Sequence, residues 1–184
     1  MRLNICLAAL AATLVASPAM AQSVPAAPTF PTDTASAIAK GTVLQNHSLV
    51  NATALDFGIV TTDTTNGGTV SISASATPAR TISGVAGGVT PLPSTFTAAR
   101  FDGLAAPTES VVLSLAGPSG GVITDAANDT IKVTNLYVDQ SNNMNRQANS
   151  TGNFTVYVGG DFVLAGSQPS GVYSGTFQLT AEYQ

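Results

Sequence analysis

The chain has 184 residues, with six Lys and Arg against ten Asp and Glu, and a net charge of −4 when its single histidine is neutral. The cations are few and scattered, so no basic patch is available for phosphate backbones, which argues against nucleic-acid binding. Charged residues make up only 9% of the chain. Thr, Ser, Asn and Gln supply most of the polarity, and such a composition favours strands and turns over helices.

The N-terminal segment, residues 1–21, has the pattern of a secretory signal peptide. Arg2 gives a positive start, residues 5–15 form an apolar run, and Ala19 with Ala21 makes an A-x-A cleavage site. The apolar run is shorter than the about 20 residues that a membrane-spanning helix needs. We therefore expect cleavage between Ala21 and Gln22, export to the periplasm, cell surface or medium, and no stable membrane anchor.

Three prolines, Pro25, Pro28 and Pro31, make residues 22–35 a flexible, extended arm rather than a strand or helix. From residue 36 onward, short β-rich runs alternate with clusters of Gly, Asn, Asp and Pro, which predicts one β-sandwich domain over 36–184. Strands are predicted at 38–50, 54–61, 69–76, 80–85, 96–101, 110–115, 122–125, 130–138, 154–158 and 162–164.

The last predicted strand, 173–183, has the clearest pattern. Apolar residues occupy odd positions and polar residues occupy even ones, so one face would pack on the core. The predicted core face consists of Tyr173, Phe177, Leu179, Ala181 and Tyr183. Nine or ten short strands predict an all-β protein with an immunoglobulin-like antiparallel β-sandwich.

The sequence shows no catalytic machinery. His47 is the only imidazole, and the only cysteine, Cys6, leaves with the signal peptide, so zinc sites, Ser-His-Asp triads and cysteine nucleophiles lack partners. The carboxylates are spread singly through turn-like contexts. Residues 139–145 are rich in oxygen ligands but lack EF-hand spacing, so we expect an exposed loop. We predict a protein that is not an enzyme and has no cofactor or metal.

Three stretches carry a family resemblance: LDFGIV at 55–60 with GGTVSI at 67–72, AARF at 98–101, and QPSGVYSGTF at 168–177 continuing to Tyr183. Together they resemble the secreted bacterial family named domain of unknown function 4402, over about residues 36–184. That family is similar to spore-coat-U-like and fimbrial, pilin-like subunit domains. The resemblance implies an immunoglobulin-like sandwich with a structural or adhesive surface role, and it supplies no catalytic residues. The chain lacks the early disulfide cysteines of many spore-coat-U-like subunits.

These observations favour a non-catalytic, exported surface protein, involved in cell adhesion or in a filament, whose partners are itself or other fimbrial subunits. A neighbour's N-terminal arm would add a strand to its sheet, with Ile38, Val43 and Leu44 as candidate strand-exchange residues. The simpler interpretation is that residues 36–50 form the domain's own first strand. An alternative function is a monomeric carbohydrate- or matrix-binding module, which needs an exposed aromatic platform in a chain without Trp.

Overall fold

The computed structural model describes residues 36–184, and the predicted signal peptide, with Ala21 and Gln22, lies outside these residues. Residues 42–184 form one compact unit that holds every strand of the described chain. The prediction of an all-β fold is confirmed, with twelve strands instead of nine or ten. Over residues 36–184, no helix has both the length and the apolar character that crossing a membrane requires.

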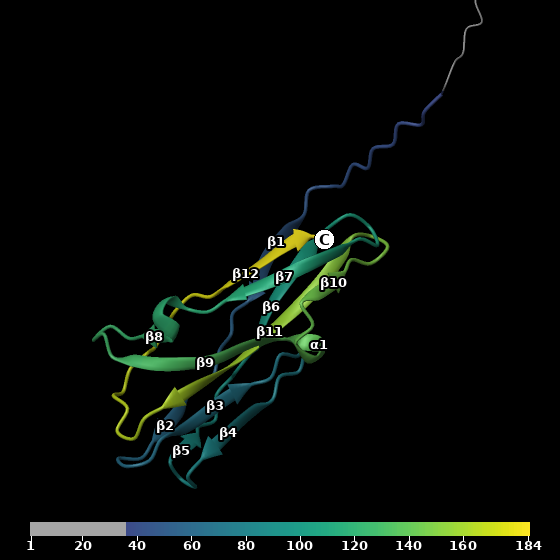
Figure 1. The fold of residues 1–184 in the computed structure, drawn as a ribbon. Coiled ribbons are helices and arrows are strands. Elements are labelled where there is room, and N and C mark those ends of the chain that lie inside the picture. The colour runs from purple at the N-terminus through teal and green to yellow at the C-terminus, as the bar shows by residue number, and fades with distance from the viewer. Residues whose placement is uncertain (1–35) are drawn as a thin grey trace, which may run out of the picture. The chain divides into compact units, whose positions relative to one another are not determined.

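The larger sheet is built around β11 (Asn153–Leu164), its longest strand (Figure 1). Val158 pairs with β6 on one edge and with β9 on the other, and Gly160 pairs with β3 and again with β9. The first half of β11 therefore pairs with β6, and its second half lies between β3 and β9. The other strands of this antiparallel sheet are β1 (Ser48–Thr53), β3 (Gly68–Ile72), β4 (Arg80–Gly84), β6 (Ala99–Leu104), β8 (Val122–Thr124) and β9 (Thr130–Val138).

Two adjacent glycines lie where β11 changes partners. The sequence prediction of separate strands on either side of Gly159 and Gly160 is wrong, because β11 runs through both. A Cβ atom on Gly159 would lie 2.2 Å from the carbonyl oxygen of Ile72, and one on Gly160 would lie 2.7 Å from a methyl group of Leu136. These glycines do not interrupt the strand; they let the neighbouring backbone and side chains approach it closely.

A second layer covers one half of the larger sheet. It consists of β7 (Ser110–Ala116) between β10 (Asn145–Gln147) and β12 (Gln178–Tyr183). The main core lies between the layers and includes Ala99, Phe101, Phe154, Val156 and Val158 from the larger sheet, and Val111, Leu113 and Ala181 from the second layer. Burying each large apolar side chain stabilises the fold by about 1.5–3 kcal/mol, and this two-layer core confirms the predicted sandwich.

The remaining elements are short. Strands β2 (Val60–Thr62) and β5 (Val89–Pro91) pair with each other, and η1 (Ser119–Gly121) is a single 3-10 turn. The four-residue α1 (Asp139–Asn142) has left-handed φ at Gln140 and Ser141, so it is a tight turn in the predicted loop, not a true helix. The sequence did not predict β5 and β10, which have three residues each.

Three predicted strands are shorter than expected. The first, predicted at 38–50, begins only at Ser48, and residues 36–47 form no strand. Residues 54–59 make a single bridge, between Asp56 and Thr97, instead of a strand. The C-terminal strand is regular from Gln178, and the residues before it make one bridge, between Ser174 and Thr124. The last two irregular stretches line the same groove of the domain.

Candidate functional site: an open groove along the sandwich

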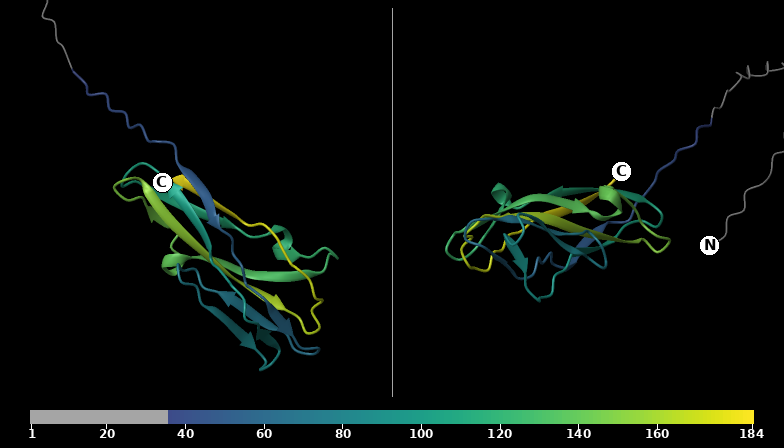
Figure 2. Two further views of the ribbon diagram at one scale, coloured as in Figure 1. Left: turned by 180° about the vertical axis from the view of Figure 1, so that it is seen from behind. Right: turned by 90° about the horizontal axis from the view of Figure 1, so that it is seen from below.

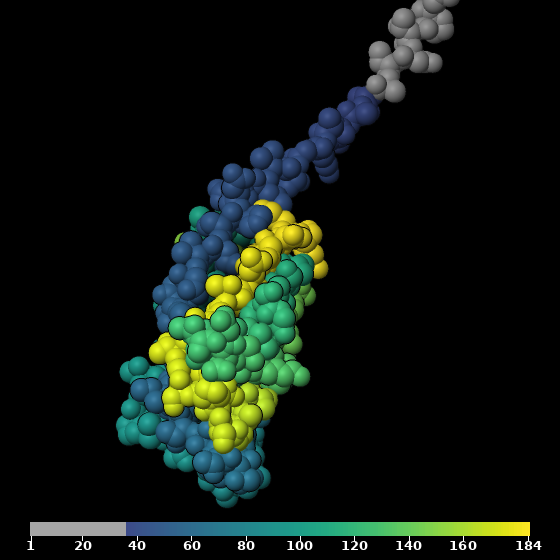
Figure 3. All heavy atoms as spheres, turned by 90° about the vertical axis from the view of Figure 1, so that its left-hand side faces the viewer, coloured from purple at the N-terminus to yellow at the C-terminus, as the bar shows by residue number. Residues whose placement is uncertain are grey.

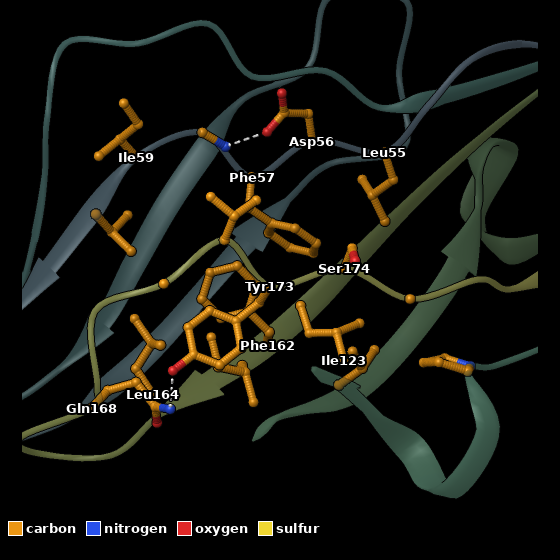
Figure 4. A pocket seen from close by; sticks show the side chains of 18 of the residues that line it. Leu55, Asp56, Phe57, Ile59, Ile123, Phe162, Leu164, Gln168, Tyr173 and Ser174 are labelled. Carbon is orange, nitrogen blue, oxygen red and sulfur yellow. Dashed lines mark hydrogen bonds between the residues drawn. The ribbon is translucent and has the colours of Figure 1, made fainter. Parts of the chain in front are cut away.

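Two segments, 54–62, which ends in β2, and 168–177, form the walls of a groove of about 1060 Å³ (Figure 4). The edge strands of the two layers, β1 and β12, lie next to each other on the same side of the domain (Figures 1 and 2). They are not paired with each other. Figure 3 shows the N-terminal strand region in blue beside the yellow C-terminal segment along this face. The first wall follows β1 in the chain and the second wall leads into β12, so the groove lies beyond the ends of these two strands.

The floor of the groove is apolar and only partly covered. Phe162 and Leu164 of β11 are buried, whereas Phe57, Ile123 and Tyr173 are half-buried against them. The rings of Phe57 and Phe162 meet edge to face with centroids 4.3 Å apart, and Figure 4 shows Tyr173 beside them. Each square ångström of apolar surface left in water forgoes about 25 cal/mol of stabilisation, so an apolar occupant of the groove would stabilise the domain.

The first wall, 54–62, is held by backbone bonds, through the Asp56–Thr97 bridge and the pairing of β2 with β5, and by side chains. The Arg80 guanidinium donates hydrogen bonds to the carbonyl oxygens of Phe57 (3.1 Å) and Leu92 (2.9 Å), and it lies 4.9 Å from the centroid of the Phe96 ring. The Asp56 carboxylate accepts the Gly58 amide at 2.8 Å, at a φ of +74° that suits glycine. This wall is therefore anchored on the side away from the groove.

The second wall, 168–177, is held by few backbone bonds. Within residues 36–184, its backbone bonds to other backbone are limited to the two between Ser174 and Thr124 (2.8 and 3.0 Å). The Tyr173 hydroxyl donates a hydrogen bond to the carbonyl of Pro169 (2.7 Å) and accepts one from the side-chain amide of Gln168 (3.0 Å). Most N–H and C=O groups on this wall thus have no strand partner, and such groups form the edge to which another strand can add.

At one end of the groove, hydrogen bonds join the residues that adjoin the two walls. The Ser167 amide donates to the Asp63 carbonyl (2.8 Å), and the Ser167 hydroxyl donates to the Thr64 carbonyl (2.7 Å). The Asp63 carboxylate accepts the backbone amides of Asn66 and Thr65, which lowers the pKa of Asp63 below its ordinary value of 3.8. The groove is therefore fixed at this end.

The Asp63 hydrogen bonds predict a pH dependence. A carboxyl group whose pKa is depressed by folding contributes stability above its unfolded pKa, and that contribution is lost as the pH falls through the folded pKa. We expect Asp63→Asn to lower the free energy of unfolding at pH 6, and the difference from the wild type to shrink below about pH 4. Urea unfolding at several pH values measures this. A difference that stays constant down to pH 2.5 would contradict the assignment.

The predicted C-terminal core residues lie on one face, and their even-numbered neighbours are exposed. Ala181 is buried, whereas Leu179 and Tyr183 are half-buried against the main core. Tyr173 and Phe177 line the groove. The candidate strand-exchange residues Ile38, Val43 and Leu44 are 86%, 95% and 40% exposed.

The described residues assemble no metal-binding cluster. His47 packs the edge of its ring against Tyr183, with centroids 5.4 Å apart. Across residues 36–184, no three His, Asp or Glu side chains gather in a way that could hold a metal ion. Asp56 is the one charged residue that lines the groove. The groove is therefore lined mainly by apolar and uncharged polar side chains.

Sequence reasoning missed the role of Arg80. Its fork of N–H donors reaches a wall more than 20 residues away in the chain, and a lone arginine in a predicted strand gives no signal of that contact. The walls contain the LDFGIV and QPSGVYSGTF stretches, and the family resemblance that these stretches carry was the available signal.

Comparison with protein families gives one match: the model described as Domain of unknown function (DUF4402) matches residues 48–183. Comparison with the curated proteins and with the solved structures gives no match. The matched range starts at the first residue of β1 and ends at the last residue of β12, so it covers the whole sandwich and both groove walls. The chain belongs to the DUF4402 family of domains of unknown function.

Proposed function

We propose that this protein is an exported, non-catalytic structural subunit of the cell surface, pilin-like in its assembly, in which an extended segment of one copy adds as a strand to the groove of the next. The observation that carries this proposal is the groove with an apolar floor whose second wall, 168–177, has few backbone hydrogen bonds to other segments. In strand addition, main-chain hydrogen bonds provide affinity and alternate side chains fill pockets. The second wall offers main-chain groups without a strand partner, and the floor offers apolar surface to the side chains of an added strand.

Export and the absence of catalysis are parts of the same proposal. The predicted signal peptide supports a location outside the cytoplasm, which a surface subunit needs. The groove has one carboxylate, Asp56, and no paired acid or base near it, which supports a binding role over a hydrolytic one.

The alternative of a carbohydrate-binding module has less support. Such a module would present aromatic rings to a sugar, but each of the ten Phe and Tyr residues within 36–184 is buried or half-buried. Three of the four tyrosines, Tyr137, Tyr173 and Tyr183, also use their hydroxyl groups in hydrogen bonds within the domain. The groove floor is a better match to a peptide segment than to a sugar face.

Assembly state tests the proposal. We expect purified residues 22–184 to form oligomers or filaments, measured by size exclusion with light scattering and by negative-stain microscopy. We expect residues 46–184, which retain every strand, to remain a folded monomer. Circular dichroism of the truncated protein is the control for folding. A stable monomer of residues 22–184 would contradict assembly by strand addition, as would oligomers of the same size from both proteins.

A further inference from the structure

We propose that the second wall, 168–177, is a lid: it closes the groove by packing the Tyr173 ring on the apolar floor, and it moves away from β8 to admit an occupant. The inference rests on the proposed function and concerns the regulation of that same groove. Its evidence lies in the few bonds that hold the lid, in the hydrogen bonds that tie residues 168–173 to one another, and in two glycines at the contact with β8.

The lid has fixed ends and a loosely bonded middle. Just before it, Ser167 is hydrogen-bonded to the segment that adjoins the first wall, and after it the chain continues into β12. Between these ends, hydrogen bonds to other segments of the described chain are limited to the two between Ser174 and Thr124 and one from the Gln168 side chain to the Thr130 carbonyl (3.1 Å). Segments with few such bonds open at a lower free energy than core strands.

Residues 168–173 form a unit of their own. The Tyr173 hydroxyl bonds to the Pro169 carbonyl and to the Gln168 side chain, so both of its hydrogen bonds stay within the lid. The Tyr173 ring packs on the floor beside Phe162, as Figure 4 shows, whereas the adjacent Val172 is 88% exposed. Opening of the lid would therefore carry the ring out of the groove without breaking the bonds of its hydroxyl.

The closed lid leaves little of the deepest floor accessible. Ile131, Phe162 and Leu164 line the groove, yet each is at most 5% exposed. Tyr173 packs against the cluster that these three residues form. An occupant gains affinity from apolar surface that it can reach, so movement of the lid decides how much of the floor contributes to binding.

Two glycines mark the contact between the lid and β8. Neither Gly171 nor Gly175 has a positive φ, so the backbone conformation does not require glycine there. A Cβ atom on Gly175 would lie 2.7 Å from the Cγ2 methyl of Ile123, and one on Gly171 would lie 2.4 Å from a carboxylate oxygen of Asp125. Glycine lets two segments approach this closely. The lid therefore has a defined closed position, with a glycine on either side of its two backbone hydrogen bonds to β8.

Amide hydrogen exchange measures the opening without any substitution. The amides of Ser174 and Thr124 bond across the contact between lid and β8 (2.8 and 3.0 Å). In freshly refolded, dilute protein of residues 22–184, we expect both amides to exchange at least several-fold faster than the central amides of β11, because the lid opens while the sheet stays intact. Exchange of both amides only at the rate of global unfolding would overturn the inference.

A disulfide across the same contact tests what the lid controls, because residues 22–184 contain no cysteine. Ser174 and Thr124 exchange both backbone hydrogen bonds, and such a pair has Cα atoms about 5.5 Å apart, within the range that a disulfide spans. We expect oxidation of the Thr124→Cys/Ser174→Cys variant to lower the fluorescence of the apolar probe ANS several-fold and to slow oligomer formation several-fold. Reduction should restore both.

Ser114→Cys/Thr180→Cys is the matched control for the disulfide. These two exposed residues are opposite each other in β7 and β12, so their disulfide leaves the lid free. We expect oxidation of this control to change neither ANS fluorescence nor oligomer formation. Equal effects of the two disulfides would overturn the role of the lid.

Gly175→Val tests the opposite direction. A branched side chain has no room against Ile123, so we expect the lid to stay open and the ANS fluorescence to rise several-fold above that of the wild type. Gly117→Val is the control, because a Cβ atom there meets nothing within 4 Å. Circular dichroism checks that both variants are folded. Wild-type ANS fluorescence in a folded Gly175→Val protein would overturn the glycine contact.

The readouts separate this inference from the proposed function. If the disulfide between positions 124 and 174 leaves ANS fluorescence unchanged, the lid does not control access to the floor, and this inference fails whatever the assembly does. If the disulfide lowers ANS fluorescence but leaves oligomer formation unchanged, the lid stands, and the proposed function fails because assembly does not use the groove. A lack of oligomers from the reduced protein contradicts the proposed function alone.

Discussion

Replacing Gly159 with valine is expected to lower the free energy of unfolding by about 4 kcal/mol or more, enough to unfold a domain of ordinary stability. A Cβ atom at this position would lie 2.2 Å from the Ile72 carbonyl oxygen and 2.6 Å from the Ala74 amide nitrogen. Both atoms belong to the backbone, so no side-chain rotation can relieve the overlap, and β3 would have to move away from β11. Urea unfolding followed by circular dichroism measures the loss.

Gly117→Val is the matched control for this substitution. A Cβ atom on Gly117 would meet nothing within 4 Å, and its φ is not positive. We expect this variant to change the free energy of unfolding by less than about 1 kcal/mol. A Gly159→Val protein as stable as the Gly117→Val protein would contradict the pairing of β3 with β11 at this point, and with it the position of the groove floor.

The second large effect is expected at a buried ion pair. Arg146 and Asp139 form a salt bridge in which the Arg146 side chain is 3% exposed and the Asp139 side chain 16% exposed. Arg146 also donates to the Asn145 carbonyl (3.0 Å), and its Nε atom has no partner. Asp139→Ala leaves the buried guanidinium without its counter-charge, so we expect a loss of about 3–5 kcal/mol.

The double variant Asp139→Ala/Arg146→Met is expected to recover much of that loss, because it removes the uncompensated charge and keeps an apolar side chain in the buried position. The control is Asp102→Ala at the surface pair of Arg100 and Asp102, where both side chains are nearly half exposed. Exposed pairs contribute about 0–1 kcal/mol. Equal losses for Asp139→Ala and Asp102→Ala would contradict the burial of Arg146.

The sequence was sufficient to predict strands that have a neighbouring strand along each edge. Residues 130–138 are rich in β-branched residues and 110–115 in apolar ones, and β9 and β7 form there almost residue for residue. Period-two patterns work in such strands because burial of one face fixes the register. At Gly159 and Gly160 the same reasoning failed, since a glycine pair is as typical of a loop as of a close crossing between strands.

The groove could not be predicted as a groove. Residues 55–60 and 173–177 have apolar side chains at the spacing of strands, and the sequence indicates strands there. Whether such a segment forms a ladder depends on the presence of a neighbouring strand, and here each stretch makes a single bridge, Asp56 with Thr97 and Ser174 with Thr124. Phe57 and Tyr173 are accordingly only half-buried. The apolar pattern of a segment does not show how many strand partners the fold gives it.

Residues 36–47 illustrate the complementary case. Their apolar residues favoured a strand, yet they remain outside every sheet of the described chain. A segment with strand-forming residues and no partner, and a sheet opening with no strand, occur in the same protein. Strand addition between copies would resolve both.

Amide hydrogen exchange of the second groove wall is the most direct test of strand addition. The account predicts slow exchange for residues 171–177 in assembled protein of residues 22–184, because an added strand would engage amides that have no partner within residues 36–184 apart from Ser174. It predicts fast exchange for the same residues in the 46–184 protein, and renewed protection when a synthetic peptide of residues 36–47 is added. Equally fast exchange in the assembled and the truncated protein would contradict it.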